Sequence, residues 1–383
     1  MSYIASGVLA AGFASGVLTA AASTAALGAL CFLAVRSVRQ GLKAEKAEKA
    51  YGGADAADQP PRRMVSFERV SPARRRGSRR PADQLPQDAT VTFAAERAAA
   101  DIDDVYAALD RDLVGLEPVK QKVQEVGALL LVDKARRRFG LEAPRPNLHM
   151  CFTGPPGTGK TTVALRMGEM LHRLGYLEQG QLVHAMRDDL VGEFVGQTAP
   201  RTRRVLDRAM GGVLFIDEAY YLYRATDSRD YGQEVIDILL QVMENDREKL
   251  VVILAGYKDR MDEFFQVNPG MNSRVAHHLD FAAYDMDELV SIGRVMLQQS
   301  AYYLSGQAEL AFREYLTWRR KQPEFANARS VRNELEHARL RHAHRLATDL
   351  HRRWTRDDLM RLEPEDILVD LAAVTTEPPL SGR

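Results

Sequence analysis

Cysteine is scarce in this sequence, with Cys31 and Cys151 the only two among 383 residues. Cys31 lies in a hydrophobic leader, and Cys151 lies in a short apolar run that predicts a buried strand. Because the two belong to such different segments, we expect no disulfide between them. This cysteine usage excludes a disulfide-stapled secreted fold and indicates a folded part that works in a reducing compartment.

Charged side chains are absent from residues 1–35, which are rich in alanine, glycine, serine and leucine. The run is longer than the apolar region of a signal peptide and long enough to span a bilayer, although it is only moderately hydrophobic. Acidic residues are nearly absent from residues 62–80, where Glu68 stands among eight arginines. Segments rich in arginine and poor in acids resemble organelle transit peptides.

Two interpretations of this N-terminal region stay open. It is either a bipartite leader, removed after import into a plastid with extra membranes, or a retained membrane anchor with a disordered basic linker facing anionic lipid. The first predicts a native N-terminus between residues 60 and 100, in the plastid stroma. The second predicts an ATPase domain in a reducing compartment, attached to a membrane through the leader alone. Under both, the stretch after residue 50 is too polar and too rich in proline and arginine to build a core.

The formal net charge is zero, but it is unevenly distributed. Residues 1–100 hold 14 Lys/Arg and 8 Asp/Glu, so the other 283 residues hold 38 and 44. A motor that grips duplex nucleic acid needs a basic footprint to neutralise phosphates. The acidic balance after residue 100 therefore argues against a nucleic-acid partner.

The strongest motif is a phosphate-binding loop over residues 154–161, with a predicted strand before it (residues 149–153) and a predicted helix after it (residues 162–174). Glycines let backbone N–H groups turn inward around phosphates, and the helix adds its positive dipole end. Lys160 is predicted to contact the β- and γ-phosphates, and the Thr161 hydroxyl to hold Mg²⁺. The residues expected to bind ATP here are Gly154, Pro155, Pro156, Gly157, Thr158, Gly159, Lys160, Thr161 and Thr162.

An acidic pair follows the apolar run of residues 213–216. Four apolar residues without alternation indicate a strand buried on both faces of a parallel sheet. Asp217, at its carboxyl end, is placed to bind the Mg²⁺ shell, and Glu218 to orient and deprotonate the attacking water. This pair favours an ATPase over a simple kinase or GTPase.

A third apolar run, residues 250–255, predicts another buried strand, which ends at Gly256 and Tyr257. In this fold the corresponding strand end usually presents an Asn, Thr or Ser that senses the γ-phosphate. None stands here, so that role is unassigned, and packing explains Tyr257 at least as well.

Two arginines lie in segments that resemble AAA+ motifs. Residues 268–274 resemble the segment that ends in an arginine finger, with Arg274 offered to the γ-phosphate of a neighbouring subunit. Residues 327–333 resemble the sensor-2 motif, in which an arginine of the lid domain reaches the nucleotide. Arg329 matches that motif best, with Arg332 as the alternative.

Residues 190–198 resemble the central pore loop of AAA+ rings that thread peptides, with Phe194, Val195 and Gly196 as its aromatic–aliphatic–glycine triplet. In that role Phe194 grips a polypeptide through stacking and apolar contact. The alternative is a core aromatic on a short turn. Flanking glycines and polar neighbours favour exposure.

Taken together, residues 104–370 resemble the CbbX family of red-type Rubisco activases. That family more often carries Tyr at the pore position, so Phe194 lacks the hydroxyl but keeps the gripping ring. The resemblance is carried by Asp112–Leu116, Phe152–Thr161, Phe194–Ala199, Phe215–Tyr220, Ala255–Met261, Arg274–His278, Asn327–Asn333 and Asp357–Met360.

The resemblance implies a homo- or hetero-hexameric ring that uses ATP and Mg²⁺ to remodel Rubisco. Such a ring engages the C-terminus of the Rubisco large subunit and releases inhibitory sugar phosphates, with ribulose-1,5-bisphosphate as effector. It also implies that Val114 contacts the nucleotide, and a plastid location fits the leader. The alternative is an AAA+ protein of the same family with another client, of the secretion or sporulation type.

The fold expected from these motifs is a three-layer α/β P-loop domain of the AAA+ type with a parallel sheet, followed by a small α-helical lid. We place its limits at residues 101–283 for the ATPase domain and 284–383 for the lid and tail, after the leader and linker of residues 1–100.

Overall fold

The computed structural model describes residues 84–86, 88–141, 144–223 and 231–367. The predicted hydrophobic leader and most of the basic linker lie outside these residues. Among the described helices, none combines the length and apolar character needed to cross a membrane. Helix α2 (Phe93–Ala99) lies before the predicted limit at residue 101, and its Glu96 is buried in an ion pair with Arg138 of helix α4. The domain limits stay a prediction.

Five parallel strands form the central sheet, in the order β2-β3-β4-β1-β5. Because all five run in the same direction, their carboxyl ends lie at one edge of the sheet and their amino ends at the other. The loop after β1 and the acidic pair after β3 therefore meet at the carboxyl edge, with the end of β4 between them. The strands are β1 (Met150–Thr153), β2 (Leu182–Ala185), β3 (Val213–Ile216), β4 (Val251–Gly256) and β5 (His277–Asp280).

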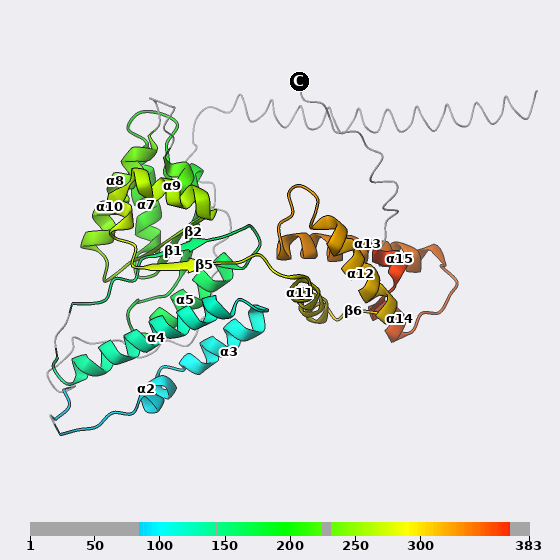
Figure 1. Ribbon diagram of the computed structural model, residues 1–383, viewed down its shortest axis with the longest axis horizontal. Helices are drawn as coiled ribbons and strands as arrows, with labels where there is room; N and C mark the ends of the chain where they lie inside the picture. Colours follow the sequence, from blue (N-terminus) through cyan, green and yellow to red (C-terminus); the bar gives the residue numbers. More distant parts are fainter. Residues whose placement is uncertain (1–83, 87, 142–143, 224–230, 368–383) are drawn as a thin grey trace, which may run out of the picture. The chain divides into compact units, whose positions relative to one another are not determined.

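Helices cover both faces of this sheet and make a three-layer domain (Figure 1). Alternate strand residues explain the layers, because Phe152 and Phe215 point into one hydrophobic core while Cys151 and Leu214 point into the other. The first core includes α3 (Ile102–Asp112), α4 (Glu117–Arg138) and α5 (Lys160–Leu174). The second includes α6 (Arg187–Leu190), α7 (Thr198–Ala209), the 3₁₀ turn η2 (Ala219–Leu222), α8 (Gly232–Asn245), α9 (Lys258–Val267) and α10 (Pro269–Asn272).

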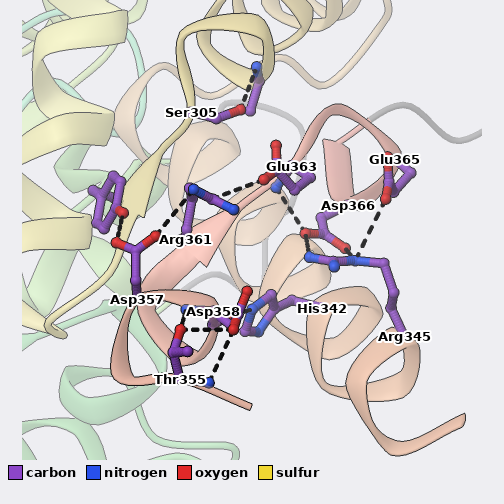
Figure 2. A network of polar contacts seen from close by, with 12 residues as sticks. Ser305, His342, Arg345, Thr355, Asp357, Asp358, Arg361, Glu363, Glu365 and Asp366 are labelled. Carbon is purple, nitrogen blue, oxygen red and sulfur yellow. Dashed lines mark hydrogen bonds and ion pairs between the residues drawn. The ribbon is translucent and has the colours of Figure 1, made fainter. Parts of the chain in front are cut away.

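A smaller, mostly helical part follows the sheet. It also contains a two-stranded parallel pair, β6 with β7, which the expectation of a purely helical lid did not include. Buried Asp366 accepts from Arg345 of α13 at 2.7 Å, which fastens α15 to that helix (Figure 2). Arg361 pairs with Asp357 and Glu363 within the last elements. The elements are α11 (Met286–Gln299), β6 (Tyr303–Leu304), α12 (Gly306–Arg319), α13 (Ala328–Thr348), α14 (Arg356–Met360), β7 (Arg361–Leu362) and α15 (Pro364–Ile367).

His149, which directly precedes β1, makes the stability of the sheet depend on pH. Its side chain is 2% exposed, Nε2–H donates to the Met243 carbonyl at 2.9 Å, and Nδ1 accepts from the Val252 N–H at 3.0 Å. Burial lowers the pKa of His149 below its usual value, although Met243 and Glu244 oppose this. The ring is therefore neutral in the folded state, and protonation costs the bond from Val252.

We expect His149 to contribute stability that is complete above its unfolded pKa, about 6.5, and is lost as the pH falls below it. The free energy of unfolding, measured by urea titration between pH 8 and pH 5, should fall less steeply for His149→Gln than for the unchanged protein. Equal pH slopes for the two proteins would contradict this.

Candidate nucleotide site

The phosphate loop of residues 154–159 leads directly from β1 into α5, which begins at Lys160 rather than at the predicted Thr162. Gly154, Gly157 and Gly159 have φ of +141°, +73° and +93°, values that favour glycine. Lys160 Nζ donates to the Gly154 carbonyl at 2.8 Å and to the Pro155 carbonyl at 2.7 Å. The Lys160 ammonium group thus lies inside the loop, where it can bind phosphate oxygens.

Neighbouring backbone approaches the loop so closely that two of its glycines have no room for a side chain. A Cβ on Gly157 would overlap the Ala326 carbonyl, and one on Gly154 would overlap the Phe281 carbonyl. Gly159 lies against Leu113, in the break between α3 and α4. Val114, in the same break, is partly buried against the first hydrophobic core, and its contact with the nucleotide stays a prediction.

The segment before α13 is hydrogen bonded to the phosphate loop. Asn327 Nδ2 donates to the Pro156 carbonyl at 3.1 Å, and its Oδ1 accepts from the Tyr284 N–H at 3.2 Å. The Tyr284 hydroxyl donates to the Thr158 carbonyl at 3.2 Å. The lid segment is thus attached to the loop on which phosphates would lie.

Arg329 follows two residues after Asn327, in the first turn of α13. Burial lowers the pKa of Lys160; Asp217 and Glu218 oppose this, and the charge of Arg329 adds to the lowering. Arg329 therefore lies close enough to Lys160 for their charges to interact. This is where a sensor-2 arginine is required, and Arg329 remains our prediction for that role.

Asp217 follows the last residue of β3, and its N–H donates to the Ala185 carbonyl at 2.9 Å. Burial raises the pKa of this carboxyl, but contact with His184 and the charge of Lys160 outweigh it and hold the pKa below its usual value. The His184 Nε2 to Asp217 Oδ2 distance is 3.6 Å. An ionised carboxylate after β3 and the exposed hydroxyl of Thr161 in the first turn of α5 are donors of the kind that suits Mg²⁺.

Glu218 adopts a left-handed backbone conformation, with φ +52° and ψ +45°. Burial and the charge of Asp217 raise the pKa of its carboxyl, whereas Lys160, Arg260 and Arg329 oppose this. Its Oε2 is buried and has no hydrogen-bond partner among the described residues. A strained backbone and an unpaired carboxylate oxygen are typical of a functional residue, and this oxygen suits a water substrate.

Arg274 lies at the opposite edge of the sheet from the phosphate loop, because it precedes β5 whereas the loop follows β1. The strand between those edges is about 13 Å long at about 3.3 Å per residue. Arg274 Nη1 donates to the Gly270 carbonyl at 3.1 Å, and Nε lies 3.4 Å from Glu244 Oε2. The structure therefore brings Lys160, Asp217, Glu218 and Arg329 together but not Arg274, whose action on a neighbouring subunit stays a prediction.

The predicted pore loop connects α6 to α7. Phe194 is 66% exposed and Val195 is 82% exposed, while Gly196 has φ +81° and open space where a Cβ would lie. At the base, the buried hydroxyl of Thr198 accepts from the Gly192 N–H at 3.0 Å. The expectation that Phe194 is exposed is confirmed, and the loop combines a fixed base with an apolar tip.

Two family models match the chain: the ATPase family associated with various cellular activities (AAA) over residues 150–282, and the AAA lid domain over residues 285–377. Protein CbxX (chromosomal) of Cupriavidus necator is 59% identical over 269 residues, covering 70% of this chain and 84% of that protein. Protein CbbX of Cereibacter sphaeroides is 57% identical over 266 residues, covering 70% and 86%. The chain belongs to the CbbX family of AAA ATPases.

Another relative of this CbbX-family chain, "Ribulose bisphosphate carboxylase/oxygenase activase, chloroplastic" of Cyanidioschyzon merolae, is 54% identical over 279 residues, covering 73% of this chain and 95% of that one. The predicted family, the AAA+ fold with its lid, and the assignment as a nucleotide-binding ATPase are confirmed. The roles of individual site residues stay predictions.

Sequence reasoning missed four residues that the structure places around the site: His184, Arg260, Tyr284 and Asn327. Asn327 is the first residue of the segment that resembles the sensor-2 motif, so a sequence pattern already pointed to it. Tyr284 and His184 reach the site only through the packing of the sheet, and no local pattern marks them.

Proposed function

We propose that this CbbX-family ATPase is a red-type Rubisco activase, which assembles into a ring, engages the C-terminus of the Rubisco large subunit and releases inhibitory sugar phosphates. The observation that carries the proposal is the 54% identity, over 95% of its length, with a relative whose name states that activity. The plastid stroma as its location rests on the same relative, whose name includes the word chloroplastic.

The residues of the site fit ATP turnover in defined roles. The loop of residues 154–162, with Val114 and with Arg329 from the lid, holds the nucleotide. Thr161 and Asp217 would hold a magnesium ion, which would supply positive charge against the phosphate oxygens. Glu218 orients and deprotonates the attacking water, and Arg274 completes the site of the neighbouring subunit.

The test is reactivation of red-type Rubisco inhibited by sugar phosphate, by protein starting near residue 84, with ATP and with or without ribulose-1,5-bisphosphate. We expect Rubisco activity to recover only when ATP is present, and ATP hydrolysis to rise when ribulose-1,5-bisphosphate is added. ATP hydrolysis without any recovery of Rubisco activity would overturn the proposal that Rubisco is the client and would favour another protein client.

Replacing Phe194 with alanine should separate hydrolysis from remodelling. Phe194 is exposed and lies outside the phosphate loop, so Phe194→Ala should change the ATPase rate by less than about threefold. The loss of an apolar grip on the client should lower Rubisco reactivation at least about tenfold. Phe194→Tyr, which keeps the ring, serves as the matched control and should reactivate Rubisco normally. Full reactivation by Phe194→Ala would show that the loop does not grip the client.

A further inference from the structure

Three tyrosines surround one arginine at the end of β4, where the sequence lacks a polar sensor. The Arg260 guanidinium carbon, in the first turn of α9, lies 5.1 Å from the ring centroid of Tyr220 and 5.8 Å from that of Tyr257. Arg260 Nη1 donates to the hydroxyls of Tyr220 and Tyr221 at 3.4 and 3.3 Å. We call Tyr220, Tyr221, Tyr257 and Arg260 the tyrosine clamp. A cation is attracted to the face of an aromatic ring, so Arg260 holds the tyrosine rings of the clamp together.

The tyrosine clamp is continuous with the turn that carries Glu218. Tyr220 and Tyr221 belong to η2, which begins directly after Glu218, and the Tyr221 N–H donates to the Glu218 carbonyl at 2.9 Å. A non-glycine residue in the left-handed region is strained and persists only where its surroundings fix it. Arg260 from α9, and Arg187 from α6, which donates to the Tyr221 carbonyl at 2.6 Å, supply such contacts.

Tyr220 also packs directly on the backbone of β4. A Cβ on Gly256 would lie 2.8 Å from Tyr220 Cδ1, so the ring occupies the space of a side chain there. The Gly256 carbonyl in turn accepts from the Gly154 N–H at 3.0 Å. The clamp therefore joins the Glu218 turn to the strand end beside the phosphate loop.

We propose that Arg260 is a positioning residue for ATP hydrolysis, which holds the Glu218 turn against the end of β4 through the tyrosine clamp. It thereby holds the Glu218 carboxylate in the position from which it can deprotonate the attacking water. This inference rests on the proposed role of Glu218 as the base. A small displacement of such a group lowers the rate of the chemical step without changing the binding of the nucleotide.

The test is steady-state ATPase kinetics of the full chain with Arg260→Met, which keeps an apolar stem but removes the charge and the planar head. We expect kcat to fall about tenfold to a hundredfold, and KM for ATP to stay within about twofold. Arg260→Lys, which keeps the charge but not the stacking, should recover part of kcat. Arg247→Met, on an exposed arginine after α8, is the matched control and should leave both constants unchanged.

A double-mutant cycle with Glu218→Gln separates this inference from the role of Glu218. If Arg260 acts through Glu218, Arg260→Met should not lower the residual turnover of Glu218→Gln any further. The same fold-loss in both backgrounds would overturn the inference, as would a rise in KM at unchanged kcat, which would place Arg260 on the nucleotide. Full turnover by Glu218→Gln alone would overturn the proposed role of Glu218 as the base.

Gly256→Ala provides a second route that leaves the charge of Arg260 intact. The added Cβ pushes the Tyr220 ring away from β4. We expect the same fall in kcat at unchanged KM, and thermal melting and binding of fluorescent ADP to match the unchanged protein. This variant decides the question if Arg260→Met fails to fold, and unchanged kcat would overturn the inference.

Discussion

Arg274→Ala should bind ATP with unchanged affinity and lose at least about 10³-fold in turnover, because an arginine finger contributes about 10³–10⁵ in rate. The parallel sheet separates Arg274 from its own phosphate loop, so we expect its guanidinium to act on the nucleotide of a neighbouring subunit. The measurement is ATP hydrolysis together with fluorescent-nucleotide binding. Arg247→Ala, on an exposed arginine after α8, controls for the loss of a positive charge.

Mixing two inactive variants tests the same role more sharply. Lys160→Ala should lose nucleotide binding but keep Arg274, and Arg274→Ala should keep Lys160. In a mixed ring, a site with Lys160 from one subunit and Arg274 from the next is complete, so turnover should return. A mixture as inactive as its components would contradict action across the interface, and so would full turnover by Arg274→Ala alone.

Glu218→Gln should retain ATP binding and lose about 10²–10⁴-fold in turnover, the usual contribution of general base catalysis. Glutamine keeps the size of the side chain, so the left-handed turn and the contacts of Tyr221 need not change. The proposed ring should then stay in its ATP-bound state, which size-exclusion chromatography in ATP should detect as a persistent assembly. Glu263→Gln, on an exposed glutamate of α9, is the matched control.

A single-turnover experiment adds a second criterion for Glu218. Radiolabelled ATP bound by Glu218→Gln should remain intact over the time in which the unchanged protein converts all of it to ADP. Rapid conversion by the variant would assign the base to another residue.

The sequence predicted the three inner strands of the sheet better than the two outermost ones. Strands β1, β3 and β4 are buried on both faces and appear as continuous apolar runs, so they were expected within one residue of their observed bounds. Strands β2 and β5 were not expected. They are the outermost strands of the sheet and carry exposed or half-buried polar residues, such as His184 and His277, which interrupt any apolar run.

The same distinction holds at the site. Motif spacing alone identified Lys160, Asp217 and Glu218, because the loop and the strand ends that carry them are continuous in the sequence. Arg260 reaches the Glu218 turn only because β4 lies between β1 and β3 in the folded sheet. Strand order is a property of tertiary structure, and no pattern within one segment of the chain encodes it.

The hydrogen bond from Asp217 to Ala185 has a mechanical consequence. Ala185, at the end of β2, is bonded to the residue predicted to hold the metal, and the exposed ring of Phe194 lies in the loop that follows α6. The four-residue helix α6 lies between them and is itself bonded through Arg187 to the turn after Glu218. We therefore expect a movement of Asp217 and Glu218 to reach the predicted pore loop through β2 and α6, by a path that does not include the lid.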